Sequence, residues 1–147
     1  MIAVLQRVSA SSVYVNGTEI ASVGKGLNIL LGIMKDDDEG EIDKALAKII
    51  NLRIFADDAG KMNLSLVDVG GEMLVVSQFT LGASIKKGRR PSFDAAAKPD
   101  DAQRLYHYFI EQASKKVPLQ HGKFGEHMEV HIENDGPVTI LVDSKEL

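Results

Sequence analysis

The sequence predicts a single α+β domain over residues 1–147, with a mostly antiparallel, barrel-like sheet and two helices. Apolar segments of strand length outnumber the helical ones, and short turns join them. Asn16-Gly17 separates two such segments, and this dipeptide is the strongest short-range signal for an antiparallel hairpin. Two other segments, after Asp38 and after Pro99, carry apolar residues at helical spacing instead.

The first of these elements are the hairpin over residues 13–20 and an apolar strand over residues 27–33. The acids of residues 36–39 then suit a helix N-terminus, because the helix dipole favours negative charge there. This helix is expected to end by Leu52, and one apolar stripe along it consists of Ile42, Leu46, Ile49 and Ile50.

A short strand over residues 53–55 and a turn over residues 57–60 precede a longer strand over residues 72–80. The longer strand has apolar residues at both parities, which predicts burial on both faces. The second helix is expected to start near Pro99, whose fixed φ suits a first helical position. Its apolar stripe consists of Ala102, Leu105, Tyr106, Phe109, Ile110 and Ala113.

Two antiparallel strands, over residues 126–133 and 138–143, are predicted to end the chain. Residues 134–137 would join them in a turn that contains Gly136 and Pro137. Proline donates no hydrogen bond to a sheet, and glycine permits close approach of another backbone. On composition alone this is an ordinary turn.

The composition narrows the class of protein. The formal net charge of −4 argues against nucleic-acid binding by bulk electrostatics. Cysteine is absent, which excludes a thiol nucleophile and thiolate metal sites. No segment approaches the ~20 apolar residues of a membrane helix, and the first residues do not resemble a signal peptide. We therefore expect a cytoplasmic protein without a membrane partner.

Polar residues continue the buried strand, at Ser77, Gln78 and Thr80. Strand alternation would place Ser77 and Phe79 on one face and Gln78 and Thr80 on the other. Hydroxyl and amide groups in enclosed space need hydrogen-bond partners, so residues of this kind line a pocket or hold a neighbouring loop. The segment is a candidate site.

A cluster of four cations follows shortly after this segment and consists of Lys86, Lys87, Arg89 and Arg90. In an otherwise acidic chain, such a cluster would select one orientation of a polyanion. A solvated basic loop explains the same residues equally well.

Two other kinds of site stay open on the residues alone. Thr80 could be a nucleophile, although no base lies beside it in the sequence. His127, Glu129 and His131 could bind a divalent metal from one strand face, but Met128, Val130 and Ile132 would then face the core, so the same pattern describes the solvent side of a half-buried strand. A non-catalytic RNA-binding module using the basic cluster is a further alternative.

Several segments together resemble the D-aminoacyl-tRNA deacylases, formerly called D-tyrosyl-tRNA deacylases. The decisive pair is Ser77-Gln78-Phe79-Thr80-Leu81 with Asn134-Asp135-Gly136-Pro137-Val138-Thr139. The resemblance runs nearly end to end, in the segments Ala3–Val8, Gly24–Leu27, Asn51–Phe55, Gly60–Ser65, Lys87–Phe93 and Asn134–Ser144.

The resemblance implies a homodimeric hydrolase without metal or organic cofactor, which cleaves the ester between a D-amino acid, or glycine, and the terminal adenosine of tRNA. It assigns Ser77, Gln78, Phe79 and Thr80 to the scissile ester, with the backbone N–H groups of Phe79 and Thr80 facing the oxyanion. It implies a cis Gly136-Pro137 peptide that reads the substrate ammonium in the partner subunit's site. The 3′ acceptor end of the tRNA would then contact Lys86, Lys87, Arg89 and Arg90.

Overall fold

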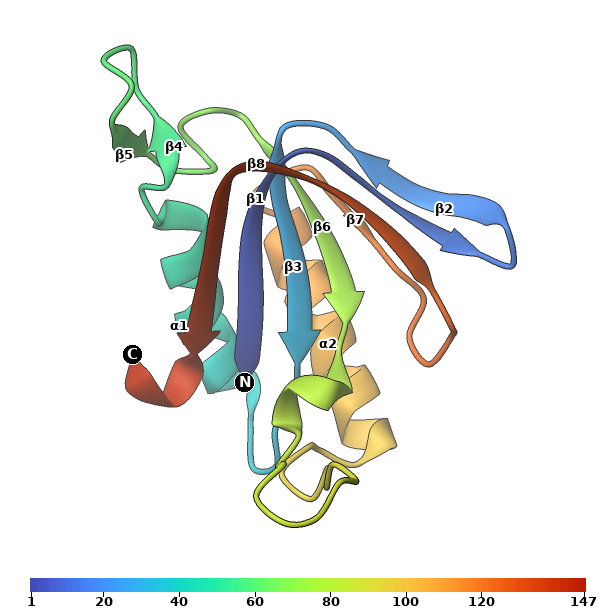
Figure 1. Cartoon of the computed structure of the whole chain (residues 1–147). Helices are drawn as coiled ribbons and strands as arrows, with labels where there is room; N and C mark the ends of the chain where they lie inside the picture. Colours follow the sequence, from blue (N-terminus) through green and yellow to red (C-terminus); the bar gives the residue numbers. More distant parts are fainter.

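The computed structural model describes residues 1–147 as one six-stranded sheet, a small two-stranded sheet and two α-helices (Figure 1). The six-stranded sheet contains β1 (Ile2–Val15), β2 (Thr18–Val23), β3 (Gly26–Gly32), β6 (Glu72–Ser77), β7 (Leu119–His121) and β8 (Glu129–Asp143). The other elements are α1 (Glu39–Asn51), β4 (Phe55–Ala56), β5 (Met62–Leu64), α2 (Pro99–Ser114) and the 3-10 helices η1 (Phe79–Gly82) and η2 (Ser144–Glu146).

β1 is the organising strand of the sheet. It pairs antiparallel with β2, β3 and β8, which confirms the mostly antiparallel prediction. Asn16 and Gly17 both have positive φ in the β1–β2 turn, as the hairpin signal requires. The pairings of β3 with β6 and of β6 with β7 are parallel, because α1 and α2 provide the crossovers that parallel strands need.

Both helices cover one face of the sheet, behind the strands in Figure 1. The Asp38 side chain caps α1 by accepting from the Glu41 backbone N–H at 2.9 Å, and Pro99 occupies the first turn of α2. The predicted stripe of α1 is buried, and that of α2 is buried except for the half-exposed Ile110. Together with the inner face of the sheet they form a core of 24 buried residues. Neither helix has the length and apolar character needed to cross a membrane.

The outer half of the β1–β2 hairpin curls over the other face of the sheet and makes it barrel-like. A second apolar cluster there consists of Val13, Ala21, Val23, Leu74 and Val76. The Ser22 backbone N–H donates to Gln120 Oε1 at 2.7 Å, which ties β2 to β7. β6 is consequently buried on both faces, as its sequence predicts.

The predicted pair of strands at the end of the chain is wrong. β8 is one continuous strand that pairs with β1 on both sides of the expected turn. Thr139 pairs with Gln6 and Asn134 pairs with Val8, so residues 135–138 form a bulge opposite Arg7 without reversing the chain. Residues 134–137 have the composition of a turn, but they form a bulge because the strand pairs with β1 again after them.

The predicted extension of β6 to Thr80 is also wrong, because the strand ends at Ser77 and η1 begins at Phe79. Phe79 and Thr80 are exposed, so strand alternation does not describe them and they do not enter enclosed space. The short strands β5 and β7 were not predicted, and the strand expected over residues 53–55 lies at Phe55–Ala56. β7 is missed because three residues carry too little pattern to detect.

Candidate active site

The turn after β6 presents free backbone donors. The Gln78 N–H donates to the Leu31 carbonyl at 2.8 Å, which fixes the end of β6 against β3. Phe79 and Thr80 are the first residues of η1, and the N–H groups at the start of a helix have no acceptor within it. The Gln78 side-chain amide donates to Thr80 Oγ1 at 2.5 Å, so the hydroxyl of Thr80 is held by its neighbour.

A pocket of about 600 Å³ opens beside this turn. Ser77, Gln78 and Phe79 line it where β6 ends and η1 begins, and Met128 and Val130 line it where β8 begins. Its other walls are largely apolar and include Phe93, Ala96, Ala97, Pro99, Ala102 and Phe124. The Phe79 and Phe93 rings meet edge to face, with centroids 5.1 Å apart. The pocket thus combines an apolar interior with backbone donors at its rim.

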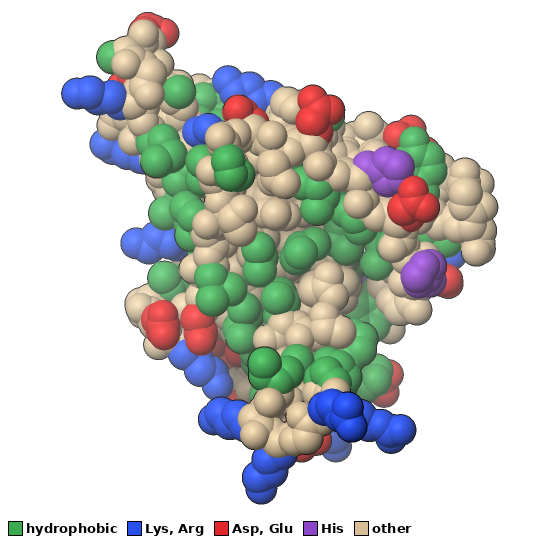
Figure 2. Space-filling view, in the orientation of Figure 1, with side chains coloured by type: hydrophobic (Ala, Val, Ile, Leu, Met, Phe, Trp, Pro, Cys, Tyr) green, Lys and Arg blue, Asp and Glu red, His purple; other side chains and the backbone are tan.

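The basic cluster lies on a loop that begins next to the pocket. Ser84 and Ser92 exchange backbone hydrogen bonds of 2.7 and 2.9 Å and close the loop at its base. Lys86, Lys87, Arg89 and Arg90 are exposed, and none of them forms an ion pair. Figure 2 shows Lys and Arg atoms gathered at the end of the molecule where this loop lies in Figure 1. Because Phe93 directly follows Ser92, the base of the loop adjoins the pocket wall.

Gly136 and Pro137 lie in the bulge of β8, exposed, and the peptide bond between them is cis. They do not line the pocket of their own chain. Arg7 supports the bulge from β1: its Nε donates to the Asp135 carbonyl at 3.0 Å and lies 3.4 Å from Asp135 Oδ2. Its Nη1 donates to the Ile54 carbonyl at 2.8 Å. One guanidinium therefore fixes the bulge to the segment that leads into β4.

The bulge has no room for a side chain at Gly136. A Cβ atom there would lie 2.9 Å from the Val138 nitrogen and 3.2 Å from Arg7 Nη2, and the residue has φ of +135°. Both the contact and the backbone conformation require glycine.

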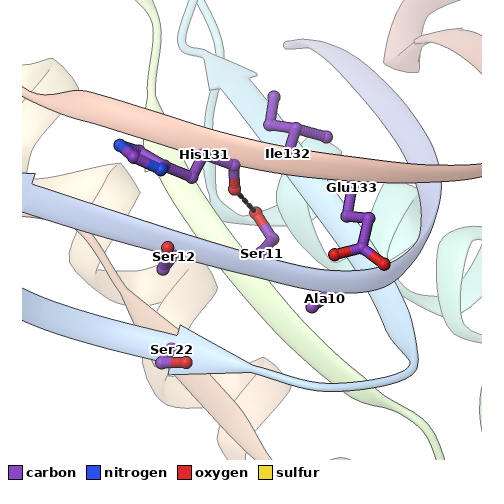
Figure 3. A pocket seen from close by; sticks show the side chains of 7 residues that line it. All are labelled: Ala10, Ser11, Ser12, Ser22, His131, Ile132 and Glu133. Carbon is purple, nitrogen blue, oxygen red and sulfur yellow. Dashed lines mark hydrogen bonds between the residues drawn. The ribbon is translucent and has the colours of Figure 1, made fainter.

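A separate hollow of about 520 Å³ lies over β1, β2 and β8 (Figure 3). Its side chains include Ser12, Ser22, His131 and Glu133, and Ser11 Oγ donates to the His131 carbonyl at 2.9 Å. It shares no lining residue with the pocket beside η1, so the two hollows are distinct, and His131 is the only candidate site residue that lines it.

Comparison with known proteins identifies the family. The family described as D-Tyr-tRNA(Tyr) deacylase matches residues 4–143. The D-aminoacyl-tRNA deacylases of Persephonella marina and of a Sulfurihydrogenibium species are 58% and 56% identical to the chain, over 147 residues and 100% of both sequences in each case. The chain belongs to this deacylase family.

Two solved structures share the fold of this chain. A c-Myc DNA unwinding element binding protein is 44% identical, with a TM-score of 0.93 over 97% of this chain and 98% of that one. A probable eukaryotic D-amino acid tRNA deacylase shares the fold at 18% identity, with a TM-score of 0.84 over 96% of this chain and 97% of that one.

The alternative chemistries gain no support from the geometry of this deacylase fold. No histidine forms a hydrogen bond with Thr80, whose recorded side-chain partner is Gln78. His127, Glu129 and His131 do not form a group that could hold a metal ion. His131 instead pairs with Glu129 and packs against the Tyr14 ring, on the solvent side of β8.

Three further residues of the site lie outside the sequence-predicted set. Arg7 supports the bulge, and Phe93 and Phe124 line the pocket. A charged residue inside the apolar run of residues 3–8 is a signal that could have singled out Arg7. No local signal separates Phe93 or Phe124 from ordinary core aromatics.

β6 is anchored from the helix side by Tyr106. Its hydroxyl donates to the Val75 carbonyl at 3.1 Å, two residues before Ser77. Burial raises the pKa of Tyr106 well above its ordinary value, so the hydroxyl remains a donor through the physiological range. The strand that presents the candidate site is therefore fixed on both sides.

Proposed function

We propose that the protein hydrolyses the ester of D-aminoacyl-tRNA at the turn after β6. Water adds to the ester carbonyl, the bond from the carbonyl carbon to the ribose oxygen breaks, and that oxygen takes up a proton. Free D-amino acid and reusable tRNA leave. The observation that carries this assignment is the juxtaposition, in a chain of the deacylase family, of free N–H donors, an apolar pocket and an unpaired basic loop.

The backbone N–H groups of Phe79 and Thr80 stabilise the negative charge that develops on the carbonyl oxygen. Donors of this kind are worth about 3–4 kcal/mol each when they are preorganised. The hydrogen bond from Gln78 to Leu31 provides that preorganisation, because it holds the start of η1 in place. The attacking water is positioned with help from the ribose 2′-hydroxyl of the substrate, which accounts for the absence of a nearby protein base.

A two-fold homodimer completes the site. The sheet face opposite the helices carries a row of paired apolar residues, Leu141, Val4 and Leu30, and Leu141 is 67% exposed. Hydrophobic atoms occupy the centre of the face in Figure 2, where these strands lie in front of the helices. A second copy would cover this face. Gly136 and Pro137 lie on the same strand as Leu141 and enter the partner's pocket.

Chirality is enforced by exclusion in this arrangement. The carbonyl oxygens of Gly136 and Pro137 bind the substrate ammonium, and the side chain of a D-residue points outward. An L-residue would place its side chain against protein backbone. Glycine has no side chain to exclude, so glycyl-tRNA is also a substrate.

The test measures turnover of matched D- and L-aminoacyl-tRNA and glycyl-tRNA, with and without a chelator, alongside sedimentation of the protein. Rapid, chelator-insensitive hydrolysis of the D-ester and a mass of about twice 16.0 kDa are expected. Chelator-sensitive turnover would favour a metal-dependent hydrolase, and RNA binding without turnover would favour a binding module. A fully active monomer at nanomolar concentration would contradict the shared site.

A further inference from the structure

The basic loop carries an apolar residue that the folded chain does not use. Ile85 is 80% exposed and immediately precedes Lys86. Eight large apolar residues of the chain are exposed; two of them, Phe79 and Phe93, line the pocket, and a third, Ile85, lies in the loop. The backbone pair Ser84–Ser92 brings Ile85 and Phe93 to the same end of the loop. One short path from the pocket to the loop therefore carries exposed apolar side chains and then unpaired cations.

We infer that this path binds the unpaired nucleotides at the 3′ end of tRNA, with Ile85 packing against a base and the cations on the adjoining phosphates. The inference rests on the proposed function and specifies which part of the RNA the loop contacts. Surfaces that bind single strands combine cations along the backbone with aromatic side chains on which the bases stack. An exposed isoleucine offers a base face an apolar contact in the same place. A duplex hides its base faces, so a surface that read phosphates alone would have no use for Ile85.

Charge decides between RNA and a second copy of this chain as the occupant. Four cations without ion-pair partners lie within five positions of Ile85. The chain as a whole carries a formal net charge of −4, so the loop is a local exception. The extended apolar row that suits a second copy lies elsewhere, on β8, β1 and β3. Like charges brought together across a two-fold contact would oppose docking of the loop on its own copy. A polyanion with exposed bases can pair its phosphates with the four cations and pack a base against Ile85.

The position of the loop beside the pocket also suits a single strand. The Phe79–Phe93 contact forms the pocket wall on the loop side. The proposed function places the ester at the turn after β6, so the terminal nucleotide that carries it would lie at the pocket beside this turn. The nucleotides just before it must leave the pocket past this wall, toward Ser84, Ser92 and Ile85. Gly88 has φ of +66°, so the loop turns at its centre, between Lys87 and Arg89.

The experiment compares three RNAs with the full-length protein: an intact deacylated tRNA, the same tRNA without its unpaired 3′ nucleotides, and a short single strand of that 3′ sequence. The variant Ile85→Ser should weaken binding of the intact tRNA and of the single strand roughly five- to tenfold. Its affinity for the truncated tRNA should equal that of the wild type. Ile85→Phe, which offers a larger platform, should bind the first two RNAs at least as tightly as the wild type.

Val67→Ser is the matched control, because Val67 is a 47% exposed aliphatic residue in the segment that precedes β6, whereas Ile85 follows that strand. It should leave all three affinities unchanged. Unchanged binding of intact tRNA by Ile85→Ser, or an equal loss on truncated tRNA, would overturn the inference. A weakened dimer with normal RNA binding would also overturn it and would assign Ile85 to the subunit contact. Wild-type turnover of D-aminoacyl-tRNA, measured in parallel, tests the proposed function separately.

Discussion

Arg7 holds Asp135 in place from the neighbouring strand: its Nε donates to the Asp135 carbonyl oxygen at 3.0 Å, while its Nη1 reaches the Ile54 carbonyl at 2.8 Å. The planar guanidinium makes both bonds at once because its donors diverge at fixed angles. The position of the Gly136-Pro137 bulge therefore depends on a residue that does not itself line the pocket.

Arg7→Lys should lower kcat/KM for D-aminoacyl-tRNA by about 10- to 100-fold, because a lysine is a single point donor and cannot bind both carbonyls in this geometry. Discrimination against L-aminoacyl-tRNA should fall at the same time. Arg53→Lys is the control, since Arg53 is exposed and adjacent to Ile54. If Arg7→Lys and Arg53→Lys both hydrolyse D-aminoacyl-tRNA at the wild-type steady-state rate, the bulge needs no support from Arg7.

Gly136→Ala should abolish most of the activity while leaving the fold intact. The added methyl group would meet the Val138 nitrogen and Arg7, and the exposed bulge would move outward rather than unfold the sheet. A displacement of ~1 Å at a reacting site can cost about 100-fold in rate. Turnover and thermal melting of the variant should be compared with those of Gly60→Ala, whose added Cβ atom has nothing within 4 Å although its φ of +75° is also positive. Normal chiral proofreading by Gly136→Ala would remove the bulge from the site.

Thr80→Ala should retain kcat within a few-fold of wild type, because the proposed chemistry uses the backbone N–H of this residue and not its hydroxyl. Loss of a true nucleophile costs several orders of magnitude in kcat. Single-turnover hydrolysis at saturating enzyme measures this step directly. A rate collapse with normal substrate affinity would establish a covalent mechanism through Thr80 instead.

The double variant Lys87→Glu with Arg89→Glu should raise KM for aminoacyl-tRNA and flatten its salt dependence. Each lost phosphate contact reduces the slope of log K against log salt by about 0.7 for a single strand. A control with the same charge change is Lys48→Glu with Lys116→Glu, two exposed lysines outside the loop and free of ion pairs. If both pairs alter the slope equally, the loop is an ordinary solvated one.

Tyr106→Phe should lower the free energy of unfolding by about 1 kcal/mol, the usual worth of a buried hydrogen bond. Because the folded pKa of Tyr106 is raised, its contribution is fully present below the unfolded pKa of about 10 and is lost as the pH rises toward the folded value. Wild-type stability should thus fall more steeply than that of the variant above pH ~10. Tyr108→Phe, in the same helix but with its hydroxyl on the exposed Asp43 side, should change stability less. Denaturant titrations across this pH range would decide.

Elements with a strong local pattern were predictable from the sequence. The β1–β2 hairpin, both helices and the double-sided burial of β6 follow from turn chemistry and periodicity. The continuity of β8 does not, because residues 134–137 have the composition of a turn and their path is decided by pairing with β1. Whether such a segment forms a turn or continues a strand depends on pairing partners that are distant in the chain.

The candidate site also has features that the sequence predicts and features that it does not. Ser77, Gln78 and Phe79 line the pocket. The polar residues that follow the apolar run of β6 predicted a pocket at this place. The exposure of Phe79 and Thr80 was not foreseeable, because the change from strand to 3-10 helix leaves the alternation of side chains undefined. Phe93 and Phe124 reach the pocket from separate loops, and a one-dimensional pattern does not encode that convergence.

The unbroken course of β8 limits how this chain can vary in length. Val130, near one end of the strand, lines the pocket, and Gly136 and Pro137 lie further along the same strand, where the proposed dimer would place them in the partner's pocket. Deleting or inserting one residue between them would turn every later side chain to the opposite face and move the bulge away from Arg7. We expect homologous sequences to keep the spacing from Val130 to Pro137 constant while the loop between Ser84 and Ser92 tolerates gaps. An engineer grafting new specificity onto this scaffold should accordingly alter the loop and leave the strand uncut.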